Sequence, residues 1–240
     1  MADEKANFSP FWLREIFPDA KNIFTTTHKT LHEIKNSCFV VLDANVLLLP
    51  YNLEDVSLPE VVDVYERLCK ANRLMIPAQA AREFAKNRSK KVAELVKYLQ
   101  DQSSLEFKIL PKKVGCLNDH SGYHALKEKA EKINNLIKIL RPQIKEIAHE
   151  IAAEVGGDPV SLAYREIFQE CVSEDPVECS DETAFKKELS LRYDNRRPPG
   201  FADKAKADHG AGDLIIWKSI LQHGKDENKD CIFVTADEKS

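Results

Sequence analysis

The apolar positions of this chain alternate between short continuous runs and stripes at helical spacing. Residues 38–42 form an apolar, β-branched run that ends at Asp43, and residues 74–76 and 231–234 form similar runs. Continuous apolar runs of this length are typical of strands that are buried on both faces of a parallel sheet. A fourth run at 107–110 alternates in polarity, ends at a proline and predicts another strand.

Helical patterns separate these runs. Ser57-Leu-Pro-Glu60 has the spacing of a capping box, and the apolar positions that follow predict a helix over about 58–71. A second helix is predicted from Ala78, and a third over 214–221, ended by His223-Gly224. Because helices and strands alternate along the chain, the pattern favours an α/β fold with a central parallel sheet.

A heptad-like seam of apolar residues runs from Leu126 to Ile151, with Pro142 inside it. A proline in this position kinks or breaks a helix, so the pattern predicts one long kinked helix or a helical hairpin, ending near Gly156-Gly157. We expect a single domain over 1–240, in which residues 112–200 form a helical insertion. The insertion offers a surface for an oligomer or a partner protein.

Composition narrows the classes of function. The 240 residues carry a net charge of −4, which argues against a protein that holds nucleic acid by bulk positive charge. The segment 186–206 is locally basic and contains Arg196-Arg197-Pro-Pro-Gly200, so we expect an irregular loop that either contacts phosphate or is merely solvated. The six cysteines form no C-x-x-C pair, which argues against zinc and favours a reducing, cytoplasmic location. No signal peptide or membrane-spanning run is apparent.

Four carboxylates are placed to meet at one edge of the predicted sheet. Asp43 and Asp237 follow strands directly, and Glu83 and Asp213 lie near the starts of helices. Helices that follow parallel strands begin at the edge where those strands end, so the four side chains could converge there. Such a group needs a counter-charge, and the usual one at an all-oxygen site is Mg²⁺ or Mn²⁺.

Each of these residues also has a purely structural interpretation. Asp43 could cap the next helix, and Asp213 could complement a helix dipole. Glu83 could face solvent, and Asp237 could hold a turn. Spacing alone leaves both interpretations open.

Four segments, in order, resemble the motifs of PIN-like nucleases. The first is Val41-Leu-Asp43-Ala-Asn45, a strand followed by Asp-x-Asn, and the second is Ile76-Pro-Ala-Gln-Ala-Ala-Arg-Glu83-Phe. The third is Gly212-Asp213-Leu-Ile-Ile-Trp217, and the fourth is Phe233-Val-Thr235-Ala-Asp237. Arg197-Pro-Pro-Gly200-Phe, before the third motif, resembles a larger subgroup of the family that is found in bacterial proteins.

The resemblance implies a Rossmann-like three-layer α/β/α sandwich and metal-dependent hydrolysis of RNA or, less often, DNA. It implies that Asp43, Glu83, Asp213 and Asp237 gather one or two Mg²⁺ or Mn²⁺ ions, and that Asn45 and Thr235 support them by hydrogen bonding. Members include toxins, RNA-processing enzymes and antiviral defence nucleases. The family fold normally continues past the fourth motif, whereas this sequence stops three residues after Asp237. A truncated chain or a partner segment that completes the edge would explain the difference.

The favoured function is a metal-dependent endoribonuclease for single-stranded or structured RNA, in which Arg196 and Arg197 contact the substrate. A phosphatase of the haloacid-dehalogenase type needs a second acid two positions after Asp43, where this chain has Asn45. A non-catalytic PIN-like module, which binds a partner or oligomerises through the insertion, remains the alternative.

Overall fold

The computed structural model describes residues 10–11, 13–14, 17, 19–25, 29–52, 57–104, 115–117, 119–153, 158–201 and 210–236. The chain divides into two compact units. The first consists of residues 1–86 and 164–240 and contains the sheet, and the second consists of residues 87–163. No helix within the described ranges has the length and apolarity needed to cross a membrane.

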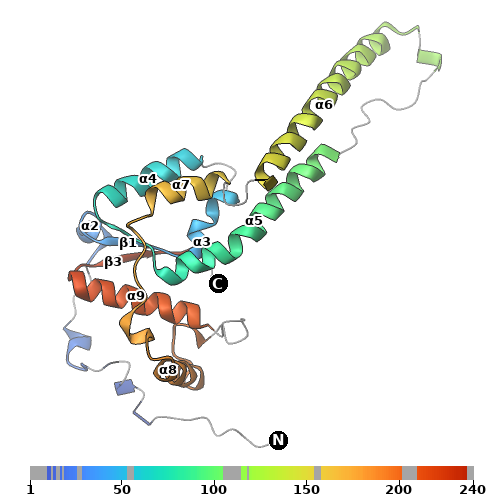
Figure 1. Ribbon diagram of the computed structural model, residues 1–240. Coiled ribbons are helices and arrows are strands. Elements are labelled where there is room, and N and C mark those ends of the chain that lie inside the picture. The colour runs from blue at the N-terminus through green and yellow to red at the C-terminus, as the bar shows by residue number, and fades with distance from the viewer. Residues whose placement is uncertain are drawn as a thin grey trace, which may run out of the picture. The chain divides into compact units, whose positions relative to one another are not determined.

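A three-stranded parallel sheet lies at the centre of the first unit (Figure 1). Its order is β2 (Leu74–Met75), β1 (Phe39–Leu42) and β3 (Cys231–Val234). Val40 pairs with Leu74 on one side, and Leu42 pairs with Val234 on the other. Beyond β2, Ile76 forms a parallel bridge with Val172. The strands predicted at 38–42, 74–76 and 231–234 are therefore confirmed.

Helices lie on both sides of the sheet (Figure 1), and buried apolar residues of α4 and α9 contribute to the core. In the first unit, α4 and α9 lie on opposite sides of the sheet (Figure 1). The capping box predicted for Ser57 and Glu60 is present at the start of α4. The described part of the first unit contains α2 (Leu31–Ile34), α3 (Ala44–Leu47), α4 (Leu58–Lys70), the start of α5 (Ala78–Ser104), the end of α7 (Pro159–Ile167), α8 (Glu182–Asp194), α9 (Ala211–Glu227) and the short 3-10 turns Asn22–Phe24, Leu49–Tyr51 and Val177–Cys179.

The core of the first unit combines aliphatic strand residues with a cluster of aromatic rings. Tyr164 lies at the centre of this cluster, with ring centroids 4.7 Å from Phe168, 5.6 Å from Phe84 and 6.1 Å from Tyr65. Its hydroxyl donates a 3.1 Å hydrogen bond to the carbonyl oxygen of Leu47, which ties α7 to α3. The helix that follows Asp43 is therefore anchored from outside the sheet.

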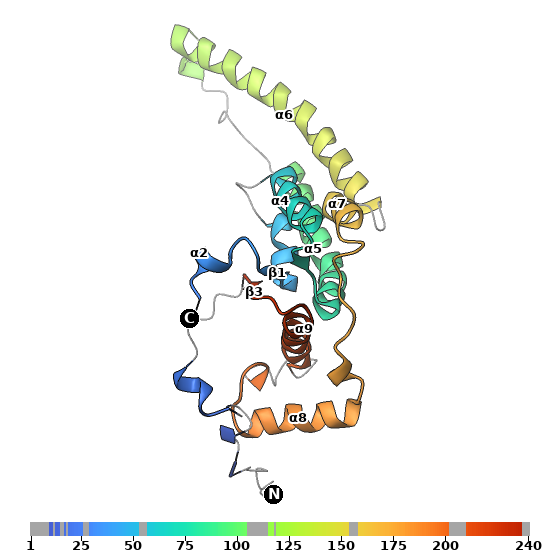
Figure 2. The same ribbon diagram turned by 90° about the vertical axis from the view of Figure 1, so that its left-hand side faces the viewer.

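The second unit contains the rest of α5, the 3-10 turn Gly115–Leu117, the long helix α6 (Ser121–Ala153) and the start of α7. Of the two predicted alternatives, one long helix is found, because α6 continues through Pro142. Figure 2 shows its gradual curve. The side chains of Ala130 and Ala148 are buried. The insertion over 112–200 and the single domain over 1–240 stay predictions.

Two sequence-based predictions differ from the structure. The predicted basic loop at 186–206 was wrong over 186–194, where α8 forms because Asp181 caps it through hydrogen bonds from Thr183 N and Ala184 N, each 3.0 Å. Helix α9 does not stop at His223-Gly224. It continues to Glu227 and ends at Asn228, whose left-handed backbone lets its amide bond to the carbonyl oxygen of Gly224.

The strand predicted at 107–110 and the helix end predicted at 156–157 lie outside the described residues. The sequence pattern predicted an α/β fold with a parallel sheet. The structure confirms this class, and most of its described elements are helices. The three-layer sandwich stays a prediction.

Candidate active site

Asp43 lies at the first position after β1, beside the first position after β3. Its backbone amide donates a 3.0 Å hydrogen bond to the carbonyl oxygen of Val234, so the pairing of the two strands continues one step past their ends. Asp43 is also the N-cap of α3, and its Oδ1 accepts a 2.7 Å hydrogen bond from the amide of Ala44. The capping role considered from sequence is therefore real.

Thr235 and Asn45 complete a hydrogen-bonded ring around the Asp43 carboxylate. The Thr235 hydroxyl donates to Asp43 Oδ2 at 2.8 Å. Asn45 Nδ2 donates to Thr235 Oγ1 at 3.0 Å, and Asn45 Oδ1 accepts from the amide of Ala236 at 2.9 Å. Both oxygens of Asp43 are thus held in one orientation, and the ring locks the end of β3 to the start of α3.

A pocket of about 250 Å³ opens at this edge of the sheet, and it brings Asp43 and Asp213 together. Asp213 lies in the first turn of α9, as the sequence predicts. Residues three, four and seven positions after it lie on the same face of the helix and line the same pocket. Besides the two carboxylates, the lining consists of Pro199, Ile216, Trp217, Ile220, Phe233 and Thr235.

The other two predicted carboxylates are not brought into this pocket by the described residues. Glu83 lies in the second turn of α5, where its Oε1 accepts a 2.8 Å hydrogen bond from Gln79 Nε2. Asp237 lies outside the described residues. Within the part of the chain that is described, no group of three or more His, Cys, Asp or Glu side chains is close enough together to hold a metal ion.

The predicted basic element begins directly after α8. Arg196 has a left-handed backbone, with φ of 50°, and its side chain is exposed. The amide of Arg197 donates a 2.8 Å hydrogen bond to the carbonyl oxygen of Arg192. Two residues further on, Pro199 reaches the pocket, so the Arg196–Gly200 turn forms part of its rim.

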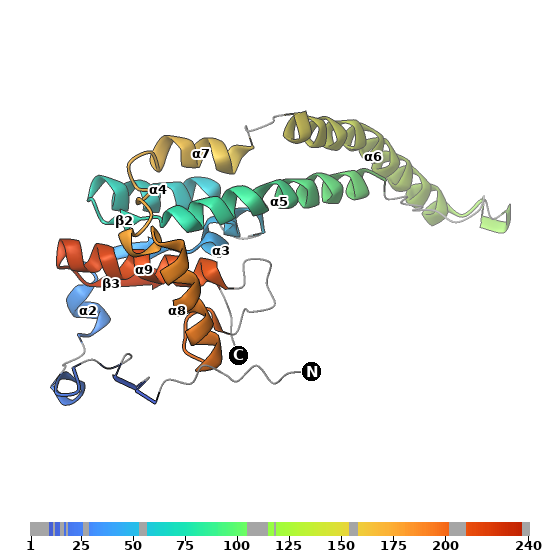
Figure 3. The same cartoon turned by 60° about the horizontal axis from the view of Figure 1, so that its bottom comes forward.

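Sequence reasoning missed the ion network that holds this turn against α9. The buried guanidinium of Arg192 donates to Glu188 Oε1 at 2.7 and 2.9 Å and to the carbonyl oxygen of Pro198 at 2.8 Å. Glu188 in turn pairs with Lys218 of α9 at 2.8 Å. Figure 3 shows α8 running across the direction of α9. The i, i+4 spacing of Glu188 and Arg192 was visible in the sequence, but the contact with Lys218 was not.

Burial and hydrogen bonding act in opposite directions in this network. Burial raises the pKa of Glu188, but the hydrogen bonds from Lys218 and Arg192 outweigh it, so the pKa lies below its ordinary value. Burial lowers the pKa of Lys218, and the hydrogen bonds to Glu178 and Glu188 raise it above its ordinary value. Both groups are therefore charged at neutral pH, and the salt bridge between α8 and α9 is intact.

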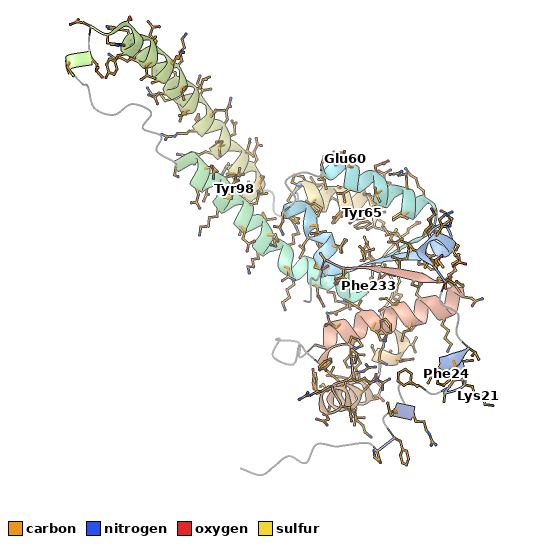
Figure 4. All side chains as sticks on the ribbon, turned by 180° about the vertical axis from the view of Figure 1, so that it is seen from behind. Lys21, Phe24, Glu60, Tyr65, Tyr98 and Phe233 are labelled. Atoms are coloured by element: carbon orange, nitrogen blue, oxygen red, sulfur yellow. The ribbon has the colours of Figure 1, made fainter. Side chains whose placement is uncertain are left out.

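The aromatic part of the pocket was also missed as a functional feature. Trp217 lies on α9. Phe233 lies on β3 (Figure 4), two positions before Thr235. Each ring is 42% exposed, although both belong to apolar runs that predict burial. In the sequence, the one indication that these two residues have a functional role was that each lies within one of the four motifs.

The polar groups of this pocket fit a hard divalent cation better than zinc. Asp43, Asp213 and Thr235 contribute only oxygen atoms, which suit Mg²⁺ or Mn²⁺, and no Cys or His lines the pocket among the described residues. The fixed orientation of the Asp43 carboxylate is what a metal ligand needs from its hydrogen-bond partners.

Comparison with known proteins agrees with this arrangement. The model of a family described as PIN like domain matches residues 39–240, from the start of β1 through the fourth motif. Searches of curated proteins and of solved structures give no match. PIN-like domains are generally nucleases and usually use divalent metals. Since the match covers most of the sequence, the chain belongs to the PIN-like domain family.

Proposed function

We propose that this protein is a metal-dependent endoribonuclease that hydrolyses phosphodiester bonds in single-stranded or structured RNA. One observation carries the proposal: Asp43 and Asp213, from opposite ends of the chain, line one pocket, and Thr235 fixes the orientation of Asp43. Glu83 and Asp237 are the proposed further members of the carboxylate set. Asn45 and Thr235 are the proposed supporting residues.

The residues of the chain have separate tasks in this proposal. Asp43 and Asp213 supply anionic oxygens at the pocket floor, and one or two Mg²⁺ or Mn²⁺ ions bound there would polarise the phosphate and activate a water molecule. Thr235 and the amide of Ala44 hold the Asp43 oxygens still, so no reorganisation is needed during the reaction. Arg196 and Arg197, in the turn that brings Pro199 to the pocket, are the proposed contacts for the phosphates of the substrate.

RNA is favoured over DNA because the chain contains no helix-turn-helix or zinc-finger pattern for reading a duplex. A role as a toxin or an antiviral defence effector in the cytoplasm fits such an activity. These assignments go beyond the family match and form part of the proposal.

A second candidate function is a non-catalytic module that oligomerises or binds a partner. One observation favours it: α6 presents an exposed apolar stripe at heptad spacing. The stripe consists of Leu126, Ile133, Leu136, Leu140 and Ile147. Such a module would self-associate in a concentration-dependent way and would lack cleavage activity.

The decisive test is cleavage of mixed single-stranded RNA and DNA by the wild type and by Asp43→Asn, with Mg²⁺, Mn²⁺ or EDTA. We expect metal-dependent cleavage by the wild type, preference for RNA, and loss of cleavage in the variant. Asn is as good an N-cap as Asp, so thermal stability should be kept or raised as carboxylate repulsion is relieved. Cleavage that persists in EDTA or in Asp43→Asn contradicts the proposal.

A further inference from the structure

The pocket that Asp43 and Asp213 line is otherwise largely apolar. Metal binding by two carboxylates does not by itself explain such a lining. Five of its lining residues are apolar, and two of these, Trp217 and Phe233, carry large rings. Trp217 lies one helical turn after Asp213, and Phe233 lies in β3, two positions before Thr235. The two rings therefore line the same pocket as the two carboxylates, one from α9 and one from β3.

Both rings are partly open to solvent at this pocket. Trp217 and Phe233 are each 42% exposed, whereas Leu214 and Ile216 on α9 are buried. Exposed aromatic surface beside a polar centre is typical of a binding site for a planar or apolar group. The pocket volume of about 250 Å³ is below the range of drug-sized pockets, about 300–1,000 Å³, so it suits one small planar group.

The negative charge of the chain and of the pocket restricts which part of a nucleic acid can be the planar group that the pocket binds. The chain has a net charge of −4, and the pocket itself contains two carboxylates, so a phosphate gains little attraction from either. A nucleobase carries no charge, and every base has a π face that stacks on aromatic side chains. Stacking would supply affinity that the charge of the chain does not.

We propose that Trp217 and Phe233 form a stacking site for one unpaired nucleobase next to the phosphate that is cleaved. This inference rests on the proposed nuclease function and specifies its substrate: the strand must be unpaired at the cleavage position, and the identity of the base matters little. A base inside a duplex is already stacked on both sides and cannot enter. Pro199 contributes to the lining of the pocket from the Arg196–Gly200 turn.

The chain offers a direct probe because it contains only two tryptophans, Trp12 and Trp217. In Trp12→Phe, all tryptophan fluorescence comes from Trp217. We would titrate this protein, in EDTA, with a single-stranded oligonucleotide of about ten nucleotides, with the same strand in a blunt duplex, and with an abasic strand of the same length. We expect saturable quenching by the single strand alone. Equal quenching by the abasic strand or the duplex, or no quenching, overturns the stacking site.

A matched pair of variants tests the same site by affinity. Leu221 lies one turn beyond Trp217 on α9 and is 53% exposed, but it does not line the pocket. Trp217→Ala should weaken binding of the single strand about 5- to 150-fold, the range found for loss of one stacked base, and Trp217→Phe should retain part of the affinity. Leu221→Ala should stay within about twofold of the wild type. Equal effects of Trp217→Ala and Leu221→Ala contradict the proposal.

Failure of this inference and failure of the nuclease function give different results. If the wild type binds single strands through Trp217 but cleaves nothing with any metal, the stacking site stands and the nuclease function fails. If the wild type cleaves and Trp217→Ala leaves kcat/KM unchanged, the nuclease function stands and the stacking site fails. The absence of both quenching and cleavage overturns both.

Discussion

The hydroxyl of Thr235 donates a 2.8 Å hydrogen bond to Oδ2 of Asp43, although 192 positions separate the two residues. The pairing of β1 with β3 places them side by side, because Leu42 and Val234 are partners in the sheet and are the last residues of their strands, so Asp43 and Thr235 follow directly. The carboxylate proposed to act in catalysis is therefore oriented by the residue that directly follows β3. Loss of β3 pairing would disturb the site without touching Asp43 itself.

Replacing Thr235 by Val tests this orientation. Valine keeps the shape of threonine but removes the donor to Asp43 and the acceptor for Asn45. We expect the free energy of unfolding to fall by about 0.5–1.5 kcal/mol, and cleavage to fall about 10- to 100-fold, as is common when a ligand loses its supporting hydrogen bond. Thr235→Ser, which keeps the hydroxyl, should retain most of the activity. Wild-type cleavage by Thr235→Val would exclude the orienting role.

His223 makes stability depend on pH above the range where carboxylates titrate. It lies on α9, and its ring packs edge-on against Phe39, with centroids 4.1 Å apart. Burial lowers its pKa below the ordinary 6.5, with Lys229 acting in the same direction and Glu227 and Asp226 opposing. The unfolded chain therefore takes up this proton first, so stability is full above about pH 6.5 and falls as pH drops through the folded-state pKa.

Urea denaturation at about pH 7.5 and about pH 5.5 measures this effect. The wild type should be less stable at the lower pH. His223→Gln cannot take up a proton, so its stability should change less between the two pH values, even if it is lower at both because the contact with Phe39 is lost. An unchanged pH dependence in His223→Gln would assign the effect to other groups.

Asp158 has the same kind of double role in the second unit that Asp43 has in the first. Its side chain is buried, with Oδ2 2.6 Å from Arg88 Nε, and Oδ1 accepts a 3.1 Å hydrogen bond from the amide of Ser161 at the start of α7. Asp158→Ala removes the cap and leaves Arg88 without this partner, so we expect a loss of about 3 kcal/mol. Asp158→Asn keeps the cap and should lose less.

Amide hydrogen exchange over residues 87–163 would locate this loss, and urea denaturation would measure it. The matched control is Glu94→Ala, which removes an exposed partner of Lys91 at 3.2 Å in the same unit. Exposed pairs contribute little, so the control should change stability by less than about 1 kcal/mol. Equal effects of Asp158→Ala and Glu94→Ala would show that the buried pair is not stabilising.

The sequence predicted those parts of the site that depend on local pattern and on strand direction. Continuous apolar runs end at Asp43 and just before Thr235, and parallel strands end at one edge, so their meeting follows from the pattern alone. The position of Asp213 in the first turn of its helix was predictable for the same reason. Whether Asp237 joins them stays a prediction, because it lies outside the described residues.

Other parts of the site depended on packing that a single sequence does not encode locally. Ile216 and Trp217 are adjacent in one apolar run, yet the first is buried and the second is exposed, because α9 is covered on one side only. Likewise, counting charges over 186–206 treats Arg192 as part of a basic surface. The structure buries its guanidinium against Glu188, which removes it from that surface. Among the described arginines of this segment, Arg196 and Arg197 remain as candidate phosphate contacts.

Arg196 and Arg197 therefore carry the electrostatic part of substrate binding in this proposal. Replacing both by Gln should weaken binding of single-stranded RNA more at low salt than at high salt, because each phosphate contact releases bound counterions. Two lost contacts should reduce the slope of log K against log salt by about 1.4. Binding would be measured by fluorescence anisotropy in EDTA between about 50 and 200 mM salt, with Lys86→Gln on the exposed side of α5 as the matched control. The control should keep the wild-type slope. If the double variant also keeps the wild-type slope, the Arg196–Gly200 turn is not part of the binding surface. The aromatic pocket would then bind the strand without help from these two arginines.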